Sequence, residues 1–287
     1  MSALSATVRR RLAAAARSPR PAAIVFECSY VNGLSAIRSL AAMDVRVIAL
    51  DHRRQALGLR SRLAVPVVCP HPHEQPDEFA ALLSEVCEAL PHGAVAFPTH
   101  DEYLVAVNRS APASLRLPFG PRELIEPIQA KRFQYDAAAR AGVQLPTTFH
   151  PADEDAAAQA AAMLRYPAVM KPSEGAGFKR RHGIPLVVAE NAKELVAAYR
   201  LGAEFAPMLQ ERIPGGDDTL WTVGSYVAAD GAVPGIFCGR KLLQAPSGVG
   251  TCRVGVAEWD DEAVDGACRL LHALGFHGIS QVEYKRD

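Results

Sequence analysis

The sequence has no long apolar run, no excess of either charge and no closely spaced cysteines. No segment approaches the roughly 18 consecutive apolar residues of a transmembrane helix. Lys and Arg together number 31, as do Asp and Glu, so the basic surplus typical of nucleic-acid-binding proteins is missing. The six cysteines include no C-x-x-C pair, which favours reduced thiols over a disulfide framework. We therefore expect a cytoplasmic globular protein without a nucleic-acid or membrane partner.

The first half of the chain also lacks the dinucleotide-binding pattern G-x-G-x-x-G. Apolar runs typical of buried parallel strands, separated by helical patterns, lie at 22–28, 45–50 and 94–98. This alternation predicts a doubly wound α/β domain over residues 21–127, preceded by an N-terminal extension, residues 1–20, that we expect to be a frayed helix. The loop after the first run contains a single glycine, Gly33, and therefore does not support a nicotinamide dinucleotide site. A Rossmann-type oxidoreductase is an alternative interpretation that rests on this N-terminal domain alone.

Two polar clusters in this domain each have two interpretations. His100, Asp101 and Glu102 follow an apolar run, at the strand end where ligands of α/β sheets bind, which makes them candidate substrate contacts. They equally suit the polar start of a helix, because acids are favoured at helix N-termini, and we favour that interpretation. The segment CPHPHEQP at 69–76 offers metal-type side chains, but they lie in one Pro-rich loop rather than in separated segments. We interpret it as an ordinary loop.

A Pro-rich connection then leads into a second domain, residues 128–287, with an α+β pattern. Predicted helices begin at Lys131, near residue 153, after an Asn191 cap and near residue 261. One predicted strand ends at Lys171, and three others cover 184–190, 208–213 and 278–285. Two more, 222–230 and 233–243, form a predicted hairpin around Asp230-Gly231.

Lys171 follows the short apolar strand of this domain directly. An unpaired buried ammonium is very costly, so this lysine must reach solvent or meet an anion. Ser173, Gly175 and Gly177 come just after it, in a loop whose free N–H groups suit phosphate. About forty residues later MLQERIPGGDD forms a further strand that ends in a Gly-Gly turn. Together the two segments predict a nucleotide site with Lys171 at the phosphates.

At these two segments, YPAVMKPSEGAG and MLQERIPGGDD, the chain resembles the ATP-grasp superfamily and its carboxylate-amine ligases, the relatives of carbamoyl phosphate synthetase and biotin carboxylase. The segments KRFQYDAAARAGVQLPTTF and QVEYKRD extend the resemblance. It implies an ATP-grasp domain at 128–287 that binds ATP with Mg²⁺ or Mn²⁺. Such ligases continue into a second metal-binding Glu and an Asn on the next strand, which do not follow Asp287 here, so we expect an incomplete active site.

The resemblance also implies roles for individual residues. It places Lys131 at the ATP phosphates, Asp218 at the ribose hydroxyls and Glu283 at the metal ion. It assigns a segment to adenine, largely through its backbone: Gln210, Glu211, Arg212 and Ile213. It implies cations that stabilise the transferring phosphoryl group: Arg240, Lys241 and Arg253. We expect Arg253 to lie on a mobile glycine-containing loop.

The function implied is an ATP-dependent ligase that joins a small-molecule carboxylate to an amine through an acyl phosphate. The alternative is an ATP-binding remnant or regulatory module without ligase activity, for which the missing second metal strand is the main support. Homo-oligomerisation is compatible with either.

Overall fold

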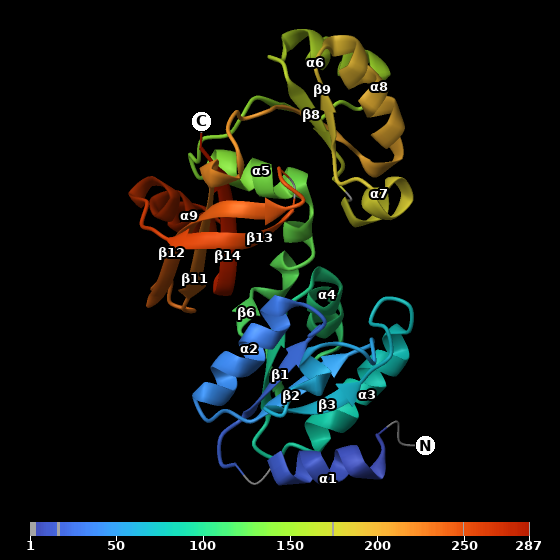
Figure 1. Cartoon of the computed structure of the whole chain (residues 1–287), viewed down its shortest axis with the longest axis vertical. Helices are drawn as coiled ribbons and strands as arrows, with labels where there is room; N and C mark the ends of the chain where they lie inside the picture. The colour runs from blue at the N-terminus through green and yellow to red at the C-terminus, as the bar shows by residue number, and fades with distance from the viewer. Residues whose placement is uncertain (1–3, 16–17, 174, 249, 287) are drawn as a thin grey trace. The chain divides into compact units, whose positions relative to one another are not determined.

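The computed structural model describes residues 4–15, 18–173, 175–248 and 250–286. The chain forms two compact units, residues 1–125 and 126–287, a division close to the Pro-rich connection (Figure 1). None of the helices in the described ranges is long and apolar enough to cross a membrane.

Unit 1 is a parallel sheet with helices on both faces, as the alternating pattern predicts. Its helices are α1 (Ala6–Ala15), α2 (Val31–Ala42), α3 (Pro76–Glu88) and α4 (Asp101–Ser110). Its strands are β1 (Ala22–Phe26), β2 (Val47–Asp51), β3 (Ala64–Val68), β4 (Ala94–Pro98), β5 (Leu115–Arg116) and β6 (Phe119–Gly120). The sheet has the order β3-β2-β1-β4-β5, and every pair of neighbours is parallel. β2 and β3 lie on one side of β1, and β4 and β5 lie on the other, so the strand order reverses between β1 and β4. In such sheets ligands bind at this crevice, at the carboxyl ends of the strands.

Side-chain alternation on the central strands explains the two helical layers. Ile24 and Phe26 of β1 pack into a core shared with α1, α3 and α4, whereas Val25 packs into the core beneath α2. Successive side chains of a strand point to opposite faces, so a wholly apolar strand must be covered on both sides.

The N-terminal helix differs from the expectation of a frayed extension. Leu12 of α1 is fully buried in the core of unit 1, and Arg9 pairs with Glu85 of α3 (Nη2 to Oε1, 3.2 Å). Composition predicts a helix here, but the core that buries Leu12 is assembled from the sheet, α3 and α4 only when the chain folds.

Unit 2 contains two antiparallel sheets. Its helices are α5 (Lys131–Arg140), α6 (Glu154–Met163), α7 (Gly175–His182), α8 (Ala192–Gly202) and α9 (Asp261–Ala273). One sheet has the order β7-β10-β8-β9 and consists of β7 (Thr148–Phe149), β8 (Ala168–Lys171), β9 (Val187–Ala189) and β10 (Met208–Glu211). The other contains β13-β12-β11-β14, with β11 (Leu220–Val227), β12 (Gly235–Ala245), β13 (Thr251–Ala257) and β14 (His277–Lys285).

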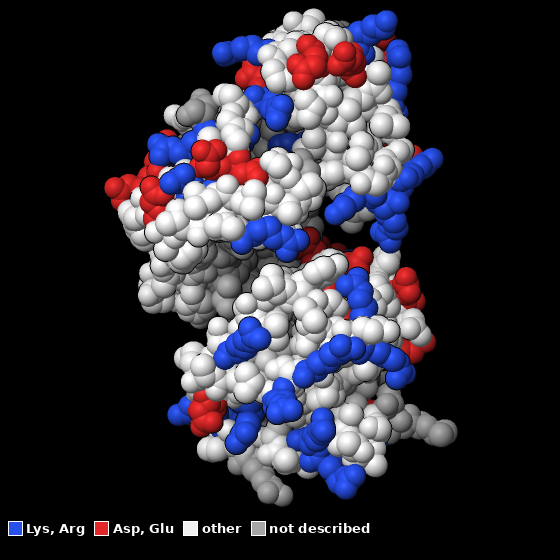
Figure 2. All heavy atoms as spheres, viewed as in Figure 1, with Lys and Arg blue, Asp and Glu red and all other residues white. Residues whose placement is uncertain are grey.

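Helices cover one face of each of these sheets. The alanine-rich α6 and α8 bury their small side chains against Met170 and Leu209 of β8 and β10. Their outer surface carries both acidic and basic side chains (Figure 2), including Glu154 and Arg200, which pair at 2.8 Å between Oε2 and Nε. The α9 helix packs on the second sheet around Trp221. The predicted α/β then α+β order is therefore the one observed.

Candidate functional site

Lys171 and Gln210 bring the two nucleotide-type segments into direct contact. β8 and β10 are neighbouring antiparallel strands, with Lys171 opposite Met208 in the register. The Lys171 ammonium donates to Oε1 of Gln210 at 2.7 Å, and the Gln210 amide nitrogen donates to Oγ1 of Thr148 at 2.7 Å. The hydroxyl of Tyr135 on α5 lies 3.3 Å from the same Gln210 oxygen. We assigned only the backbone of Gln210 to a ligand, and the sequence carried no signal for this side-chain hub.

Lys171 is partly buried, and its charge acts on another cation nearby, Lys285. Burial lowers its pKa, and its hydrogen-bond partner within the described chain is the neutral amide of Gln210. The pKa of Lys285 on β14 is also lowered, first by burial and then by the positive charges of Arg212 and Lys171. The charges of Lys171 and Arg212 therefore act unfavourably on the Lys285 ammonium, against the opposing charge of Asp217, and an anion placed beside them would relieve that repulsion.

The residues after Lys171 do not form the loop that we predicted. Gly175 and Gly177 lie in the first turn of α7, while Ser173 donates its backbone N–H to the carbonyl of Phe205 at 3.0 Å. Phe178 is fully buried and packs edge-on to Phe205, with ring centroids 5.5 Å apart. Burying this aromatic ring stabilises a helix that the glycines disfavour, so the loop prediction was wrong. Glu174 lies outside the described residues.

Lys131 begins α5 and is partly exposed. It precedes Tyr135 by one helical turn, so both occupy the same helix face. That face is the one that contacts Gln210 through the Tyr135 hydroxyl. The fold therefore places Lys131 on the side of α5 that faces the β8–β10 pair.

The segment assigned to adenine has part of its backbone already engaged. The N–H groups of Glu211 and Arg212 donate to the carbonyls of Thr147 (3.0 Å) and Pro167 (3.2 Å), so neither is free for a base. The N–H of Ile213 has no acceptor in the described part of the chain. This leaves Ile213 as the donor that the segment offers to a ligand.

Asp217 and Asp218 differ sharply in their contacts. Asp218, the residue assigned to ribose, is exposed, and its carbonyl accepts from Arg240 at 3.4 Å. Asp217 instead accepts from the N–H groups of Gln244 (3.0 Å) and Gly248 (2.8 Å), and these bonds lower its pKa, that from Gly248 most. Asp217 therefore anchors the end of β12, a role that its sequence position does not reveal.

A hollow of about 550 Å³ lies over the second sheet. Lys241 is buried and forms an ion pair with Glu283 across the sheet, with Nζ 2.8 Å from Oε1. The hydroxyl of Thr222 (3.5 Å) and the amide of Gln281 (3.3 Å) donate to that same oxygen. The structure thus brings together two residues that were assigned separately, Lys241 to the phosphoryl group and Glu283 to the metal ion.

Arg240 and Arg253 lie differently from Lys241. The guanidinium of Arg240 pairs with Glu258 at 2.9 Å and lies over the Trp221 ring, 5.9 Å from its centroid. Arg253 is exposed on β13, which corrects our expectation of a mobile loop. The glycines around it suggested a loop, but pairing with β12, interrupted by two register shifts, makes the segment a strand.

In unit 1 the segment His100 to Glu102 starts a helix, as favoured. His100 is the N-cap of α4 and accepts through Nδ1 from the N–H of Glu102 at 3.3 Å. The neighbouring strand ends carry Glu27 and Asp51, two buried carboxylates that we did not single out from the sequence.

Comparison with known proteins supports the fold. No protein-family model matches the sequence, and no curated protein matches it. Among solved structures, N5-carboxyaminoimidazole ribonucleotide synthetase from Thermus thermophilus aligns with a TM-score of 0.68 and 16% identity over 92% of this chain and 67% of its own. The L-amino acid ligase from Bacillus licheniformis aligns with a TM-score of 0.66 and 16% identity over 93% of this chain and 64% of its own.

A third similar structure is the biotin carboxylase domain of 2-oxoglutarate carboxylase from Hydrogenobacter thermophilus, solved with MgADP, ADP and bicarbonate. It aligns with a TM-score of 0.63 and 14% identity over 92% of this chain and 61% of its own. The present chain thus spans about two thirds of the length of these neighbours. At such identities the comparison establishes the fold alone, which this chain shares with these synthetase, ligase and carboxylase structures.

Proposed function

We propose that this chain binds ATP in residues 126–287 and acts as an ATP-dependent carboxylate-amine ligase. In this class of reaction ATP transfers its γ-phosphoryl group to a carboxylate, giving ADP and an acyl phosphate. The amine then attacks the acyl carbon and releases phosphate. Lys171, with Lys131 in support, contacts the phosphates, the backbone around Ile213 holds adenine and Asp218 holds ribose.

The observation that carries the proposal is the desolvated Lys171 ammonium held by the neutral Gln210 side chain. A partly buried cation that has no carboxylate partner among the described residues is unfavourable in the free protein and becomes favourable when a phosphate arrives. The added charges of Arg212 and Lys285 strengthen the attraction for a polyanion rather than for a single carboxylate. The ligase fold of the structural neighbours is the second support.

Magnesium accompanies ATP in this chemistry, and the described residues do not form a site for it. They hold no group of three or more His, Cys, Asp or Glu placed to bind a metal ion. Glu283 is the only carboxylate among the described residues that line the hollow, and it is paired with Lys241. Mg²⁺ requires several hard oxygen ligands, so Glu283 alone would leave it to ATP and water.

The Lys241–Glu283 pair also favours a second candidate function, a nucleotide-binding module that does not catalyse ligation. A carboxylate neutralised by a buried lysine is a poor ligand for a divalent cation. Phosphate release from ATP, measured with Mg²⁺ and a pool of carboxylates and amines, separates the two candidates. Turnover that depends on both co-substrates supports the ligase, and binding without turnover supports the module.

Calorimetric titration of ATP into Lys171→Met tests the site itself. Methionine keeps the apolar stem and removes the charge, so we expect the loss of one charge-assisted phosphate contact, about ten- to a hundredfold in affinity. Lys179→Met is the matched control, because Lys179 is exposed on α7. Equal dissociation constants for the wild type and Lys171→Met would refute the phosphate assignment.

A further inference from the structure

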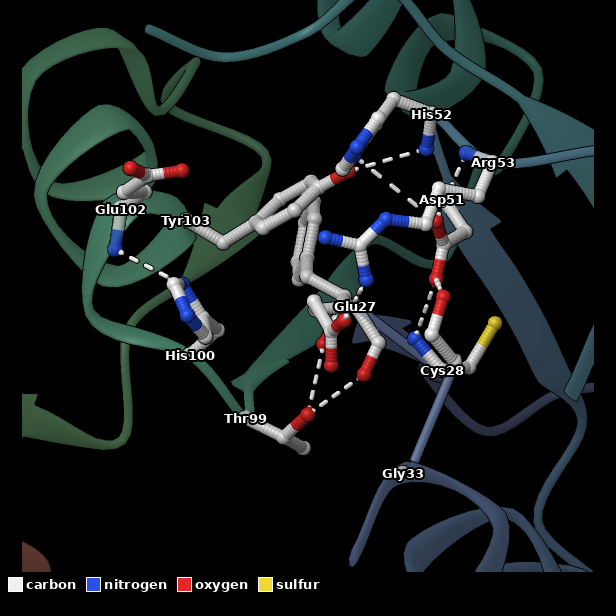
Figure 3. A network of polar contacts seen from close by, with 12 residues as sticks. Glu27, Cys28, Gly33, Asp51, His52, Arg53, Thr99, His100, Glu102 and Tyr103 are labelled. Carbon is white, nitrogen blue, oxygen red and sulfur yellow. Dashed lines mark hydrogen bonds and ion pairs between the residues drawn. The ribbon is translucent and has the colours of Figure 1, made fainter. Parts of the chain in front are cut away.

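Glu27 occupies the ligand-binding end of the sheet in unit 1. It follows β1 directly, and Thr99 follows β4, so the two residues flank the crevice where the strand order reverses. The Thr99 hydroxyl donates to the carbonyl of Glu27 at 2.6 Å, which joins the two strand ends (Figure 3). Because ligands bind at this crevice in α/β sheets, we expect a side chain at this position to contact a ligand.

The Glu27 carboxylate is buried, and one of its oxygens has no partner. The residue is 2% exposed, and Oε1 accepts from Nη1 of Arg53 at 3.2 Å. Oε2 is fully buried and accepts no hydrogen bond in the described part of the chain. Burial raises the pKa of Glu27, and the nearby charge of Asp51 raises it further. A buried carboxylate oxygen left unsatisfied is costly, and a structural role does not explain it.

The backbone of Glu27 is strained and is held in that state from several sides. Its φ is 56°, in the left-handed region that a residue with a side chain rarely adopts. The next N–H, that of Cys28, donates to Oδ2 of Asp51 at 2.8 Å, and Thr99 holds the Glu27 carbonyl. A Cβ added at Gly33 would lie 2.7 Å from that carbonyl oxygen, so α2 closes against the turn. Strain that the surroundings enforce at a strand end points to a binding role.

The surrounding groups select the chemistry of a ligand. Both oxygens of Asp51 are satisfied, Oδ2 by Cys28 and Ser29 and Oδ1 by the N–H of Arg53 at 2.8 Å. Glu27 therefore offers a single free oxygen, too few for a divalent cation but sufficient for one N–H donor. The guanidinium of Arg53 lies 5.8 Å from the centroid of the Tyr30 ring, so the edge of this crevice already accommodates a cation.

We infer that the crevice between the ends of β1 and β4 binds a small molecule that carries a protonated amine, with Glu27 as the carboxylate that recognises it. The ammonium group donates to Oε2, while Arg53 retains Oε1. The Arg53 side chain, which is 47% exposed, must swing away from Glu27 to admit the ligand and then returns to Oε1. The site lies wholly within unit 1 and needs no nucleotide, so it stands independently of the proposed function.

The test measures binding of defined amines to the full chain without nucleotide. Isothermal titration uses putrescine, agmatine, L-lysine and glycinamide, each beside its fully N-acetylated counterpart. We expect saturable binding of at least one amine, with the acetylated form weaker by at least about tenfold because it lacks the charge-assisted bond. Glu27→Gln should abolish that preference. Glu88→Gln, an exposed glutamate at the end of α3, should leave it unchanged.

Two results of the titrations would overturn the inference. One is the absence of saturable binding by all four amines up to about 10 mM, a limit that corresponds to negligible affinity. The other is an unchanged amine preference in Glu27→Gln. Glu27→Gly gives a readout besides binding, because glycine tolerates a φ of 56°. If Glu27 is retained for recognition, this variant should have a higher melting temperature than the wild type and should lose amine binding. A lower melting temperature with amine binding intact would make Glu27 structural.

Discussion

At the residue scale, the protein holds a partly buried cation and a fully buried carboxylate, neither of which has a full set of partners among the described residues. Lys171 has a neutral amide as its partner, and Glu27 leaves one oxygen unsatisfied. Each costs the free protein stability that a ligand of opposite charge would recover. Lys171 is the last residue of β8 and Glu27 follows β1 directly, so each lies at a strand end where the backbone is rigid enough to maintain the unfavourable position.

The raised pKa of Glu27 predicts a pH-dependent stability. Burial and Asp51 raise it from 4.5, against the opposing charges of His100 and Arg53. Between 4.5 and the folded-state pKa the folded protein binds more protons than the unfolded chain, so the stabilising contribution of this group is complete below 4.5 and is lost as pH rises through the folded-state pKa. Each tenfold difference in the acid constant is worth about 1.4 kcal/mol.

Glu27→Gln removes this titration and should become progressively more stable than the wild type as pH rises from 4.5 toward neutrality. Urea unfolding at a series of pH values measures the difference. Glu88→Gln serves as the control on the exposed surface. A stability difference between Glu27→Gln and the wild type that does not vary with pH would show that Glu27 titrates normally.

At the element scale, helices whose propensity is unremarkable are held in place by one or two buried side chains. Phe178 anchors α7 against Phe205, and Leu12 anchors α1 on unit 1. A helix of about ten residues is marginal in isolation, so tertiary packing decides whether it forms. The same argument explains why the glycines before Phe178 do not prevent a helix.

Leu12→Ala should therefore lower the unfolding free energy by about 2–5 kcal/mol, the cost of removing a fully buried leucine from a packed core. Arg11→Ala, on the exposed side of the same helix, should change it by less than about 0.5 kcal/mol. Both are measured by urea unfolding of the full chain. Similar small effects for the two variants would mean that α1 is frayed in solution, as composition alone suggested.

At the scale of the whole molecule, the chain carries two candidate binding sites in two separate units. The nucleotide site depends on β8 and β10 of unit 2, and the amine site depends on β1 and β4 of unit 1. A ligand that binds only the folded state stabilises it, by about 2.7 kcal/mol when its concentration is a hundredfold above the dissociation constant. Local protection from hydrogen exchange should therefore report which unit each ligand occupies.

We expect ATP to slow amide exchange in β8, β10 and the segment after β10, with little change around Glu27. An amine that binds should instead slow exchange in residues 27–29 and 99–101. Mass-spectrometric hydrogen exchange of the full chain with each ligand tests this, and Lys171→Met should lose only the ATP effect. Protection by ATP confined to unit 1 would contradict the proposed function and favour a Rossmann-type nucleotide domain.

Patterns with short-range causes were predictable from the sequence. The apolar run at 94–98 is strand β4 with those bounds, and Asn191 caps α8 through a 3.0 Å bond from the N–H of Glu194. The turn at Asp230-Gly231 connects β11 to β12, with Gly231 at a φ of 85°. Side-chain period, cap chemistry and turn conformation each depend on a few neighbouring residues, so the local sequence determined them.

Contacts between residues far apart in the sequence were decided only by the tertiary structure. The segment 175–177 is helical because Phe178 packs against Phe205. The segment around Arg253 is strand β13 because it pairs with β12. The contact of Lys171 with Gln210 spans 39 positions, and the left-handed turn at Glu27 is held by Asp51 and Thr99, far along the chain. The sequence pattern indicated that Lys171 must reach solvent or bind an anion. The desolvation that favours binding of charged ligands by Lys171 and Glu27 comes from tertiary packing, which no local pattern encodes.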